Sequence, residues 1–116
     1  MSYGFEAGSG WYDLIDVLCH CIQGHTDWKT RDFTQEEKDE FQPVASQVKS
    51  KFGGLRFYCD NGDEQTSAMI QMADAMSFKI CEECGHPGSR KGTGWIYTLC
   101  DDCWKKHKRN QNNVQP

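Results

Sequence analysis

Four cysteines toward the C-terminal end of the 116-residue chain are spaced like the ligands of a metal ion. They form two Cys-x-x-Cys pairs, separated by fifteen residues: Cys81, Cys84, Cys100 and Cys103. Zn²⁺ favours four soft ligands in a tetrahedron, and two intervening residues allow a tight turn to direct both sulfurs of a pair at one ion. Gly85 can adopt the positive φ that such a turn needs. The spacing therefore predicts a Zn²⁺ site with four thiolate ligands.

Disulfides or free thiols are the alternatives to a metal site. The chain has seven cysteines, an odd number that disfavours a fully disulfide-bonded protein. Its first residues, MSYGFEAGSGW, lack the basic and apolar regions of a signal peptide. No apolar run approaches the length needed to cross a membrane, so no membrane partner is expected. These features indicate a reducing, cytoplasmic setting, in which such cysteine pairs more often bind metal.

A second metal site around Cys19, Cys21, His25 and Cys59 is left open but disfavoured. On a helix the side chains of Cys19 and Cys21 would point about 200° apart, given ~3.6 residues per turn. Gly24 separates Cys21 from His25, and Cys59 would have to join from another element. These positions do not share the ligand spacing of the four-cysteine site.

An enzymatic role for the cysteine pairs is also disfavoured. Nucleases of the recombination endonuclease VII type share the scaffold of paired cysteines, but they place His and Asp residues between the pairs to hold a hydrolytic metal ion. In this chain the insert between the pairs contains one histidine, His86, and no acidic residue. Four sulfur ligands leave no open coordination position, so the sequence predicts a structural site and no catalytic residues.

The elements that position the cysteines follow from periodicity and turn signals. Apolar residues at helical spacing predict a first helix over residues 11–22, ended by Gly24, and a second long helix over 63–76, with Asn61 and Glu64 at capping-box spacing. Thr34 and Glu37 have the same spacing and predict a short helix over 35–41. Alternation predicts strands over 44–51 and 55–60, joined by a turn at 53–54.

The sequence thus predicts an α+β fold: a small domain of two helices and a β-hairpin, followed by a C-terminal four-cysteine module. Residues 89–99 can form a small hairpin, and a helix can begin at the second cysteine pair. We call the tight turn around the first cysteine pair, residues 81–86, the knuckle. A helix at the second pair would make the module a treble clef, whereas a second turn of the same kind would make it a zinc ribbon. The predicted boundaries are a flexible arm over 1–10, the α+β region over 11–78, the cysteine module over 79–109 and a disordered tail over 110–116.

Charge is unevenly distributed along the chain. Residues 1–78 carry thirteen acidic and six basic residues, whereas residues 79–116 carry four acidic and seven basic residues. The acidic part offers a surface for a protein partner, and the basic part offers one for nucleic acid. The candidate partner-binding residues are Asp32, Glu36, Glu37, Asp39, Glu40, Arg56 and Tyr58. The candidate nucleic-acid-binding residues are Arg90, Lys91, Lys105, Lys106, Lys108 and Arg109, with stacking surfaces at Trp95, Tyr97 and Trp104.

Three blocks together resemble a family of small, largely uncharacterised proteins encoded by bacteriophages and prophages. The blocks are VKSKFGGLRFY at 48–58, CEECGHPG at 81–88 and GWIYTLCDDC at 94–103. The resemblance extends over residues 11–104 and includes a Trp-bearing helix before the blocks. It implies a phage setting, action in the host cytoplasm and zinc on the four cysteines, but it supplies no activity.

Two functions remain for test. The favoured one is a non-enzymatic protein that binds a host protein, such as an inhibitor of a defence complex, in the manner of anti-CRISPR proteins, or of another nucleic-acid-handling machine. Acidic side chains can occupy a basic groove that normally holds DNA or RNA. The alternative is a nucleic-acid-binding zinc-finger regulator that uses the basic C-terminal helix.

Overall fold

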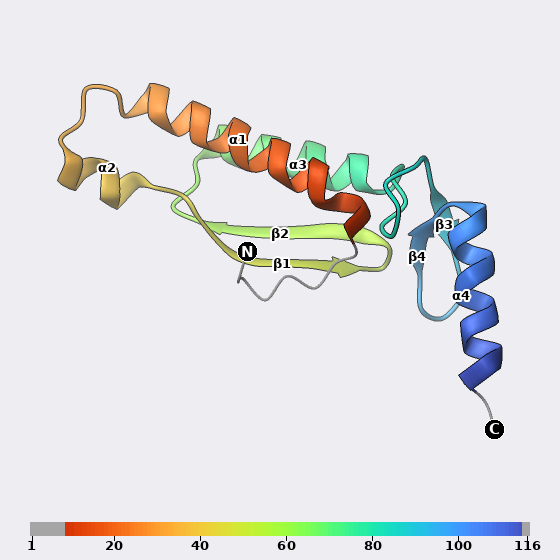
Figure 1. Ribbon diagram of the computed structural model, residues 1–116. Coiled ribbons are helices and arrows are strands. Elements are labelled where there is room, and N and C mark those ends of the chain that lie inside the picture. Colours follow the sequence, from red (N-terminus) through yellow and green to blue (C-terminus); the bar gives the residue numbers. More distant parts are fainter. Residues whose placement is uncertain (1–8, 115–116) are drawn as a thin grey trace.

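The computed structural model describes residues 9–114, and the side chains of residues 9–110. Two long helices lie side by side on one face of a two-stranded antiparallel sheet, with a short helix at one end and the four-cysteine module at the other (Figure 1). The elements are the 3₁₀ helix η1 (Ser9–Trp11), α1 (Tyr12–Lys29), α2 (Gln35–Phe41), β1 (Val44–Lys51), β2 (Gly54–Asp60), α3 (Glu64–Ser77), β3 (Ser89–Lys91), β4 (Tyr97–Leu99) and α4 (Asp101–Val114). The predicted α+β class is confirmed.

The hydrophobic core lies between α1, α3 and the β1–β2 sheet. The side chain of Trp11, the last residue of η1, is fully buried in this core. The other buried residues are Ile15, Leu18 and Ile22 of α1, Val48 of β1, Leu55 and Phe57 of β2, and Ala73 of α3. The helical spacing of the α1 residues gives one continuous apolar face, as predicted.

Helix α1 does not end at Gly24, and this prediction was wrong. The helix continues to Lys29 because Thr26 takes the next buried position on the same face. Its hydroxyl donates to the carbonyl oxygen of Ile22 at 2.8 Å, so the buried polar group is satisfied. A glycine in a helix interior costs about 1 kcal/mol relative to alanine, which the packing of this extra turn outweighs.

The starts of α2 and α3 are fixed by side-chain caps. The predicted capping box of α2 is confirmed: Glu37 N–H donates to Thr34 Oγ1 at 3.2 Å, and Thr34 N–H donates to the Glu37 carboxylate at 3.2 Å. Helix α3 is instead capped by Asp63, whose carboxylate accepts from Thr66 N–H at 2.8 Å. Asn61, the predicted cap, has a φ of 65° and donates to the carbonyl of Gln42.

The turn between β1 and β2 lies one residue earlier than predicted. Lys51 pairs with Gly54, which leaves Phe52 and Gly53 as the two central residues, with φ values of 55° and 78°. Two positive φ values match the twist of a two-residue hairpin turn. Gly54 is needed for a different reason, because a Cβ there would lie 2.3 Å from the ring of Phe78.

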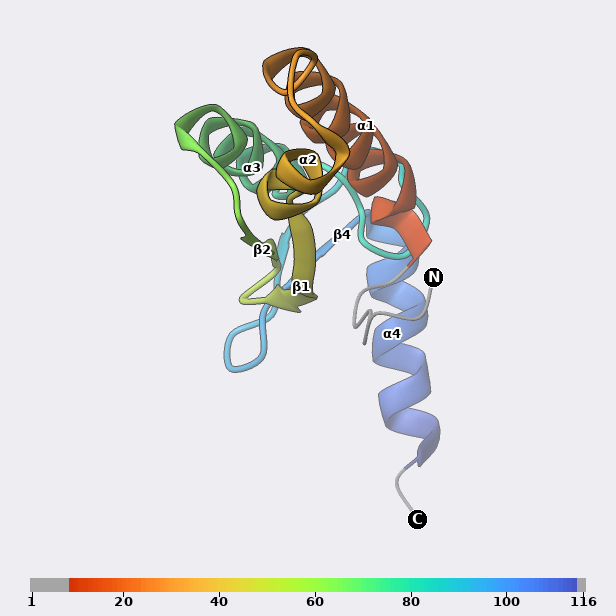
Figure 2. The same cartoon turned by 90° about the vertical axis from the view of Figure 1, so that its left-hand side faces the viewer.

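The two faces of the β1–β2 sheet differ in composition. Val48, Leu55 and Phe57 point into the core beneath α1 and α3, which both lie on that side (Figures 1 and 2). Side chains alternate along a strand, so the intervening residues project from the opposite side. We call this side the open sheet face, and its central residues are Gln47, Lys49, Lys51, Arg56 and Tyr58.

The ends of the described chain are more ordered than the sequence predicted. Residues 1–8 of the predicted arm lie outside the described residues, but Gly10 N–H donates to the carbonyl of Glu82 at 2.9 Å. Ser9 and Gly10 are therefore part of the fold. Helix α4 continues beyond Asn110 to Val114, so the predicted tail is helical over most of its length. Adding residues to an existing helix costs far less than starting one.

Candidate metal centre

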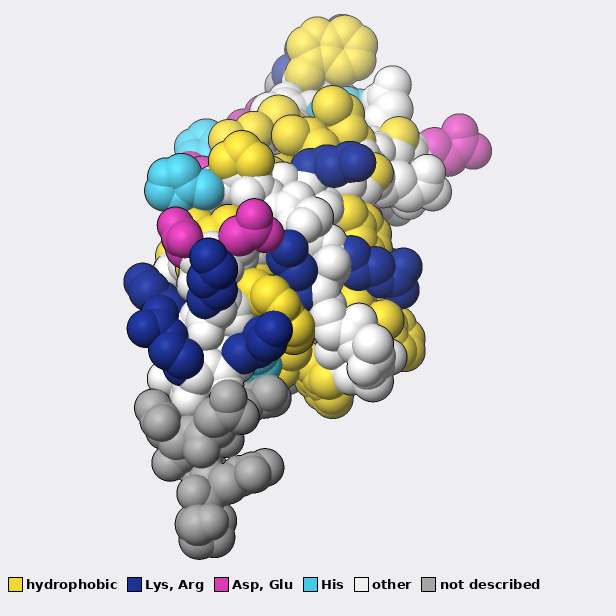
Figure 3. All heavy atoms as spheres, turned by 90° about the vertical axis from the view of Figure 1, so that its right-hand side faces the viewer, with side chains coloured by type: hydrophobic (Ala, Val, Ile, Leu, Met, Phe, Trp, Pro, Cys, Tyr) yellow, Lys and Arg dark blue, Asp and Glu magenta, His cyan; other side chains and the backbone are white. Residues whose placement is uncertain are grey.

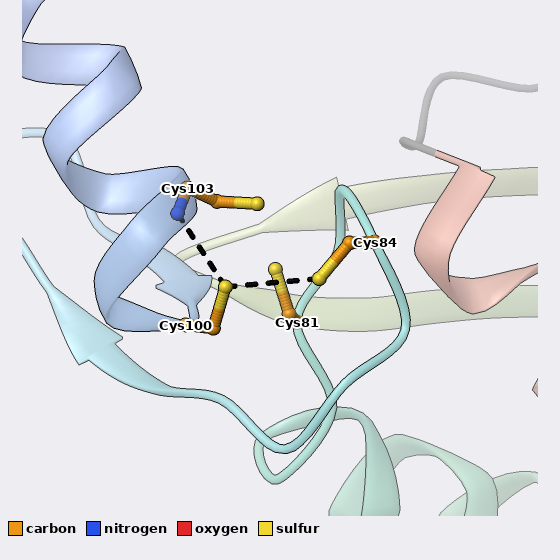
Figure 4. Close-up of side chains that lie close together, drawn as sticks. All are labelled: Cys81, Cys84, Cys100 and Cys103. Carbon is orange, nitrogen blue, oxygen red and sulfur yellow. Dashed lines mark hydrogen bonds between the residues drawn. The ribbon is translucent and has the colours of Figure 1, made fainter.

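The four predicted cysteines meet at one point of the structure. Their Sγ atoms all lie within 4.8 Å of one another, and the Sγ atoms of Cys84 and Cys100 are 3.7 Å apart. Figure 4 shows the four side chains directed into the same space from two separate segments. Cys81 is buried at the base of the cluster, and Cys84 is exposed at its rim. The site can therefore hold one metal ion with four sulfur ligands.

The first cysteine pair is positioned by a tight turn. Gly85 N–H donates to the carbonyl of Cys81 at 2.9 Å, and Cys81 N–H donates to the carbonyl of His86 at 2.7 Å. Gly85 has a φ of 82°, the conformation that its place after the pair predicted. His86 Nδ1 lies 3.2 Å from Cys84 Sγ, so this imidazole contacts a ligand sulfur from outside the four-sulfur set.

The second cysteine pair is positioned by a helix start. Cys100 follows β4, and Cys103 lies in the first turn of α4. Cys103 N–H points at Cys100 Sγ at 3.4 Å, and Trp104 N–H donates to the carbonyl of Cys100 at 2.9 Å. The module is thus a knuckle, then the antiparallel hairpin β3–β4, then a helix that bears a ligand. This is the treble-clef layout, and the zinc-ribbon alternative does not apply.

A buried glutamate joins the knuckle to β4. The backbone of Glu82 donates to Thr98 O, and Thr98 N–H donates to the Glu82 carboxylate, both at 2.9 Å. Burial raises the pKa of this carboxyl group, and the hydrogen bond from Thr98 N–H opposes the rise. The sequence gives no sign that Glu82 links these two segments, because it lies next to Glu83 in a pair that is typical of exposed acidic residues.

The electrostatics of the cluster call for a cation. Burial opposes ionisation of Cys81, but N–H groups of Cys100, Cys84 and Glu83 outweigh it and lower the thiol pKa to about 7. The pKa of Cys103 is raised well above its ordinary value, first by burial and then by the neighbouring sulfurs. Four thiolates this close together repel one another strongly, so all four ionise together only around a positive ion.

The residues considered for a second metal site do not assemble. Within residues 9–110, whose side chains are described, the four cysteines are the one group of three or more potential ligands close enough to share an ion. His25 Nε2 instead lies 2.8 Å from the Asp63 carboxylate. Cys19 and Cys21 are exposed on α1, and Cys59 packs against the core.

The predicted nucleic-acid-binding residues gather on the outer surface of the cysteine module. The module spans residues 79–114, and aromatic rings cross it in a row that we call the aromatic row: Trp95, Tyr97, His107 and Trp104. Successive ring centroids are 6.4, 4.6 and 5.7 Å apart. These residues line a pocket of about 350 Å³ together with the turn 92–94. The His107 imidazole is half-buried between Tyr97 and Trp104.

Basic side chains border this row. Figure 3 shows Lys and Arg side chains on both sides of a band of hydrophobic side chains at this end of the molecule. Lys108 Nζ lies 5.5 Å from the centroid of the Trp104 ring, and Lys105, Lys106 and Arg109 are exposed on α4. Arg90 is exposed on β3, whereas Lys91 is committed to an ion pair of 2.7 Å with Asp101. Of the six predicted cations, five are thus exposed and free of an ion pair in the described part of the chain.

The predicted partner-binding residues are divided between two places. The acidic group lies on α2 and in the loop before it, at the opposite end of the molecule from the cysteine module (Figure 1). Three of its carboxylates have local partners: Glu37 closes the capping box, Asp39 accepts from Gln35 at 2.9 Å, and Asp32 pairs with Arg31 at 3.9 Å. Arg56 and Tyr58 lie instead on the open sheet face. The structure therefore does not support a single surface made of both sets.

Fold and site together define an α+β protein with a treble-clef-type module and a candidate four-thiolate metal centre. No protein-family model, curated protein or solved structure matches the chain. Among the helices of the described residues, none combines the length and apolar character needed to cross a membrane.

Proposed function

We propose that the protein is a non-enzymatic nucleic-acid-binding protein whose C-terminal module is held together by a structural Zn²⁺. The observation that carries the proposal is the aromatic row of the cysteine module together with five exposed cations on β3 and α4, of which Lys108 contacts the ring of Trp104. Trp95 begins the row, and 75% of its surface is exposed. The other three rings are half-buried. A row of partly exposed rings on a module with exposed cations suits a ligand with flat bases and a charged backbone.

Zinc is the metal that best fits the donor set. Thiolate ligands favour Zn²⁺ over hard cations such as Mg²⁺ and Ca²⁺, and a tetrahedron of four sulfurs is typical of structural zinc. A bound Zn²⁺ would fix the knuckle to the start of α4 and thereby align β4 with the helix. The metal would supply rigidity, while binding would fall to the side chains that the module presents.

The distribution of charge supports this choice over binding through the acidic end. The segment from η1 to the end of α2, residues 9–41, carries eight acidic and three basic residues. The cysteine module carries four acidic and seven basic residues, and four thiolates on one Zn²⁺ would add a net charge of −2, which leaves the module near +1. Two of its acids have internal partners: Glu82 accepts from Thr98, and Asp101 pairs with Lys91. Separation of charge between the two ends orients the module toward a polyanion even though the whole chain is acidic.

A titration tests the proposal. A fluorescently labelled twenty-nucleotide oligodeoxythymidine is titrated with the zinc-loaded protein at several salt concentrations, and anisotropy is followed. We expect affinity to fall steeply with salt, because phosphate contacts release counterions. Trp95→Ala should weaken binding about tenfold. Trp28→Ala is the matched control, since this indole is 66% exposed on α1, far from the module. Equal affinity in the two variants, or none in the wild type, would overturn the proposal.

A second candidate function is binding of a host protein through α2. The observation that favours it is the capped helix itself, which presents Glu36 and Glu40 beside Asp39 on an exposed surface. In a bacteriophage protein, which the sequence resembles, the partner would be a host defence complex or nucleic-acid-handling complex with a basic groove. Reversal of charge at Glu36 and Glu40 should abolish capture of that complex from host extract, while Trp95→Ala should leave capture unchanged. The opposite pattern would exclude α2 as the binding surface.

A further inference from the structure

The open sheet face carries a concentration of positive charge that sheet stability does not explain. The strand register places Lys49 directly opposite Arg56, and Lys51 is the last residue of β1 on the same face. Like charges opposite each other on neighbouring strands destabilise a sheet. Within the described residues, none of the three forms an ion pair, although the charge of Arg56 also acts on Asp74 at the helix side.

Exposed aromatic rings accompany these cations. Tyr58 is paired with Gln47 across the strands, and 47% of its surface is exposed. At the hairpin turn the ring of Phe52 is 59% exposed, with Lys51 Nζ 5.5 Å from its centroid. Tyr58 and the turn are separated by roughly 13 Å of strand, at ~3.3 Å per residue. The face therefore presents a ring near each end and cations between them.

The hairpin turn at one end of the open sheet face contacts the cysteine module. The hydroxyl of Thr98 on β4 donates to the carbonyl of Gly53 in the hairpin turn. The contact is so close that a Cβ on Gly53 would lie 3.0 Å from the carbonyl carbon of Tyr97. Phe52 is therefore adjacent to Gly53, which contacts β4, the strand that carries Tyr97 of the aromatic row. The two surfaces are joined through packed backbone, and their relative position is fixed.

We propose that a single-stranded nucleic acid runs along the open sheet face and onto the aromatic row, so that both surfaces form one binding path. This rests on the proposed function, and it adds the strandedness of the ligand and the second half of its site. Rings on an open sheet can stack only on bases that are not already stacked inside a duplex. Lys49, Lys51 and Arg56 would contact the phosphates between the stacked bases.

The path predicts a dependence on strand length. A labelled five-nucleotide oligodeoxythymidine can occupy only part of it, whereas a twenty-nucleotide strand can occupy both surfaces. Tyr58→Ala and the double variant Lys49→Ala/Arg56→Ala should each weaken binding of the long strand about tenfold and change binding of the short strand much less. Tyr58→Phe keeps the ring and should bind the long strand like the wild type. Lys38→Ala, a cation of intermediate exposure on α2 like Lys49 and Arg56 on the sheet, is the control for lost charge.

The outcomes separate this inference from the function on which it rests. If the sheet variants bind the long strand like the wild type while Trp95→Ala does not, the path is overturned and the nucleic-acid function stands. If a duplex of the same length or polyglutamate competes as well as the single strand, a single-stranded ligand is overturned. If the wild type binds no oligonucleotide, both proposals fall. Oligouridine tests whether RNA uses the same path, and melting temperatures confirm that each variant is folded.

Discussion

The indole N–H of Trp11 donates a hydrogen bond of 2.9 Å to the carbonyl oxygen of Ile80, the residue immediately before the first cysteine of the cluster. Trp11 is also fully buried in the hydrophobic core between the helices and the sheet. Beside it, the backbone of Gly10 bonds to Glu82 inside the knuckle. Hydrogen bonds therefore join the residues at the start of α1 to the four-cysteine cluster on both sides of Cys81, and the two parts of the fold should lose structure together.

The first prediction concerns metal loss. Cys81→Ser and Cys103→Ser each remove one of the four sulfurs, so bound zinc should fall from one equivalent to almost none, as measured by elemental analysis. The melting temperature should fall with it, because the free energy of metal binding is also free energy of folding. Cys21→Ser is the matched control, since this thiol is exposed on α1 and outside the cluster.

Full retention of zinc in both cluster variants would remove the site assignment. The coupling through Trp11 adds a second expectation for the same samples. Amide hydrogen exchange should increase in the first turns of α1 as well as in the knuckle, because both ends of the Trp11–Ile80 contact are released. Exchange that increases in the knuckle alone would show that the two parts fold independently.

The second prediction compares two glycines. A Cβ on Gly10 would lie 2.1 Å from the carbonyl oxygen of Cys81, a backbone atom that cannot move without opening the knuckle. Gly10→Ala should therefore destabilise the protein by about 2 kcal/mol, within the range for overpacking. A Cβ on Gly24 meets nothing within 4 Å in the middle of α1, so Gly24→Ala should stabilise by about 1 kcal/mol. Chemical denaturation measures both, and effects of the same sign would contradict the prediction.

These glycines also illustrate what the sequence could reveal. Local patterns predicted each α-helix and strand of the described chain, though not the 3₁₀ helix η1, because apolar periodicity and turn chemistry act over a few residues. The cysteine ligands were equally accessible, since their spacing is itself the geometric requirement. Gly24 misled the prediction because its effect on a helix is small, and packing of Thr26 against the core outweighs it.

What the sequence could not reveal are contacts between distant segments. Gly10 gave no sign that it touches the knuckle, and Glu82 gave none that it is buried against β4. The sequence also could not show that Arg56 and Tyr58 lie on a different surface from the acidic helix α2, because this depends on which face of the sheet the helices cover. Such contacts follow from the packing of whole elements, which short-range periodicity does not determine.

The third prediction concerns Asp63, whose carboxylate caps α3 and also contacts the side chains of two basic residues. Its carboxylate lies 2.8 Å from both Lys29 Nζ and His25 Nε2. Asp63→Ala should lose the cap and the pairs, at a cost of about 1–2 kcal/mol. Asp63→Asn keeps a capping oxygen and loses the charge, so it should cost less.

The same carboxylate predicts a pH dependence. Lys29 first, then His25 and the N–H of Thr66, lower the pKa of Asp63 far below its ordinary value. The charged group therefore contributes stability that is complete above about pH 4 and is lost as the pH falls toward the folded-state pKa. The advantage of the wild type over Asp63→Asn should shrink on acidification from pH 6 to pH 3, as followed by denaturant unfolding. A constant difference would exclude the ion pairs as its cause.

The fourth prediction runs in the opposite direction along the pH scale. Asp74 of α3 has a buried carboxylate oxygen, Oδ1, that has no hydrogen-bond partner among the described residues. Burial raises the pKa of this carboxyl group to about 6, although the positive charge of Arg56 opposes the rise. The folded protein therefore binds this proton more tightly than the unfolded chain does. As the pH rises, the unfolded chain loses this proton near pH 4 and the folded protein loses it near pH 6. Between these values the folded state alone still binds the proton, so folding stability falls as the pH rises.

Asp74→Asn removes this ionisation while it preserves the size of the side chain. At pH 7 the variant should be more stable than the wild type, by an amount of the order of 1 kcal/mol once partial exposure of the group is allowed for. At pH 4, where the wild-type carboxyl group is largely protonated in the folded state, the two proteins should differ little. Asp39→Asn on the exposed helix α2 is the control. Chemical denaturation at both pH values measures these differences in stability. If Asp74→Asn were less stable than the wild type at pH 7, the folded protein would stabilise the Asp74 carboxylate, and its attraction to Arg56 would outweigh the cost of its burial.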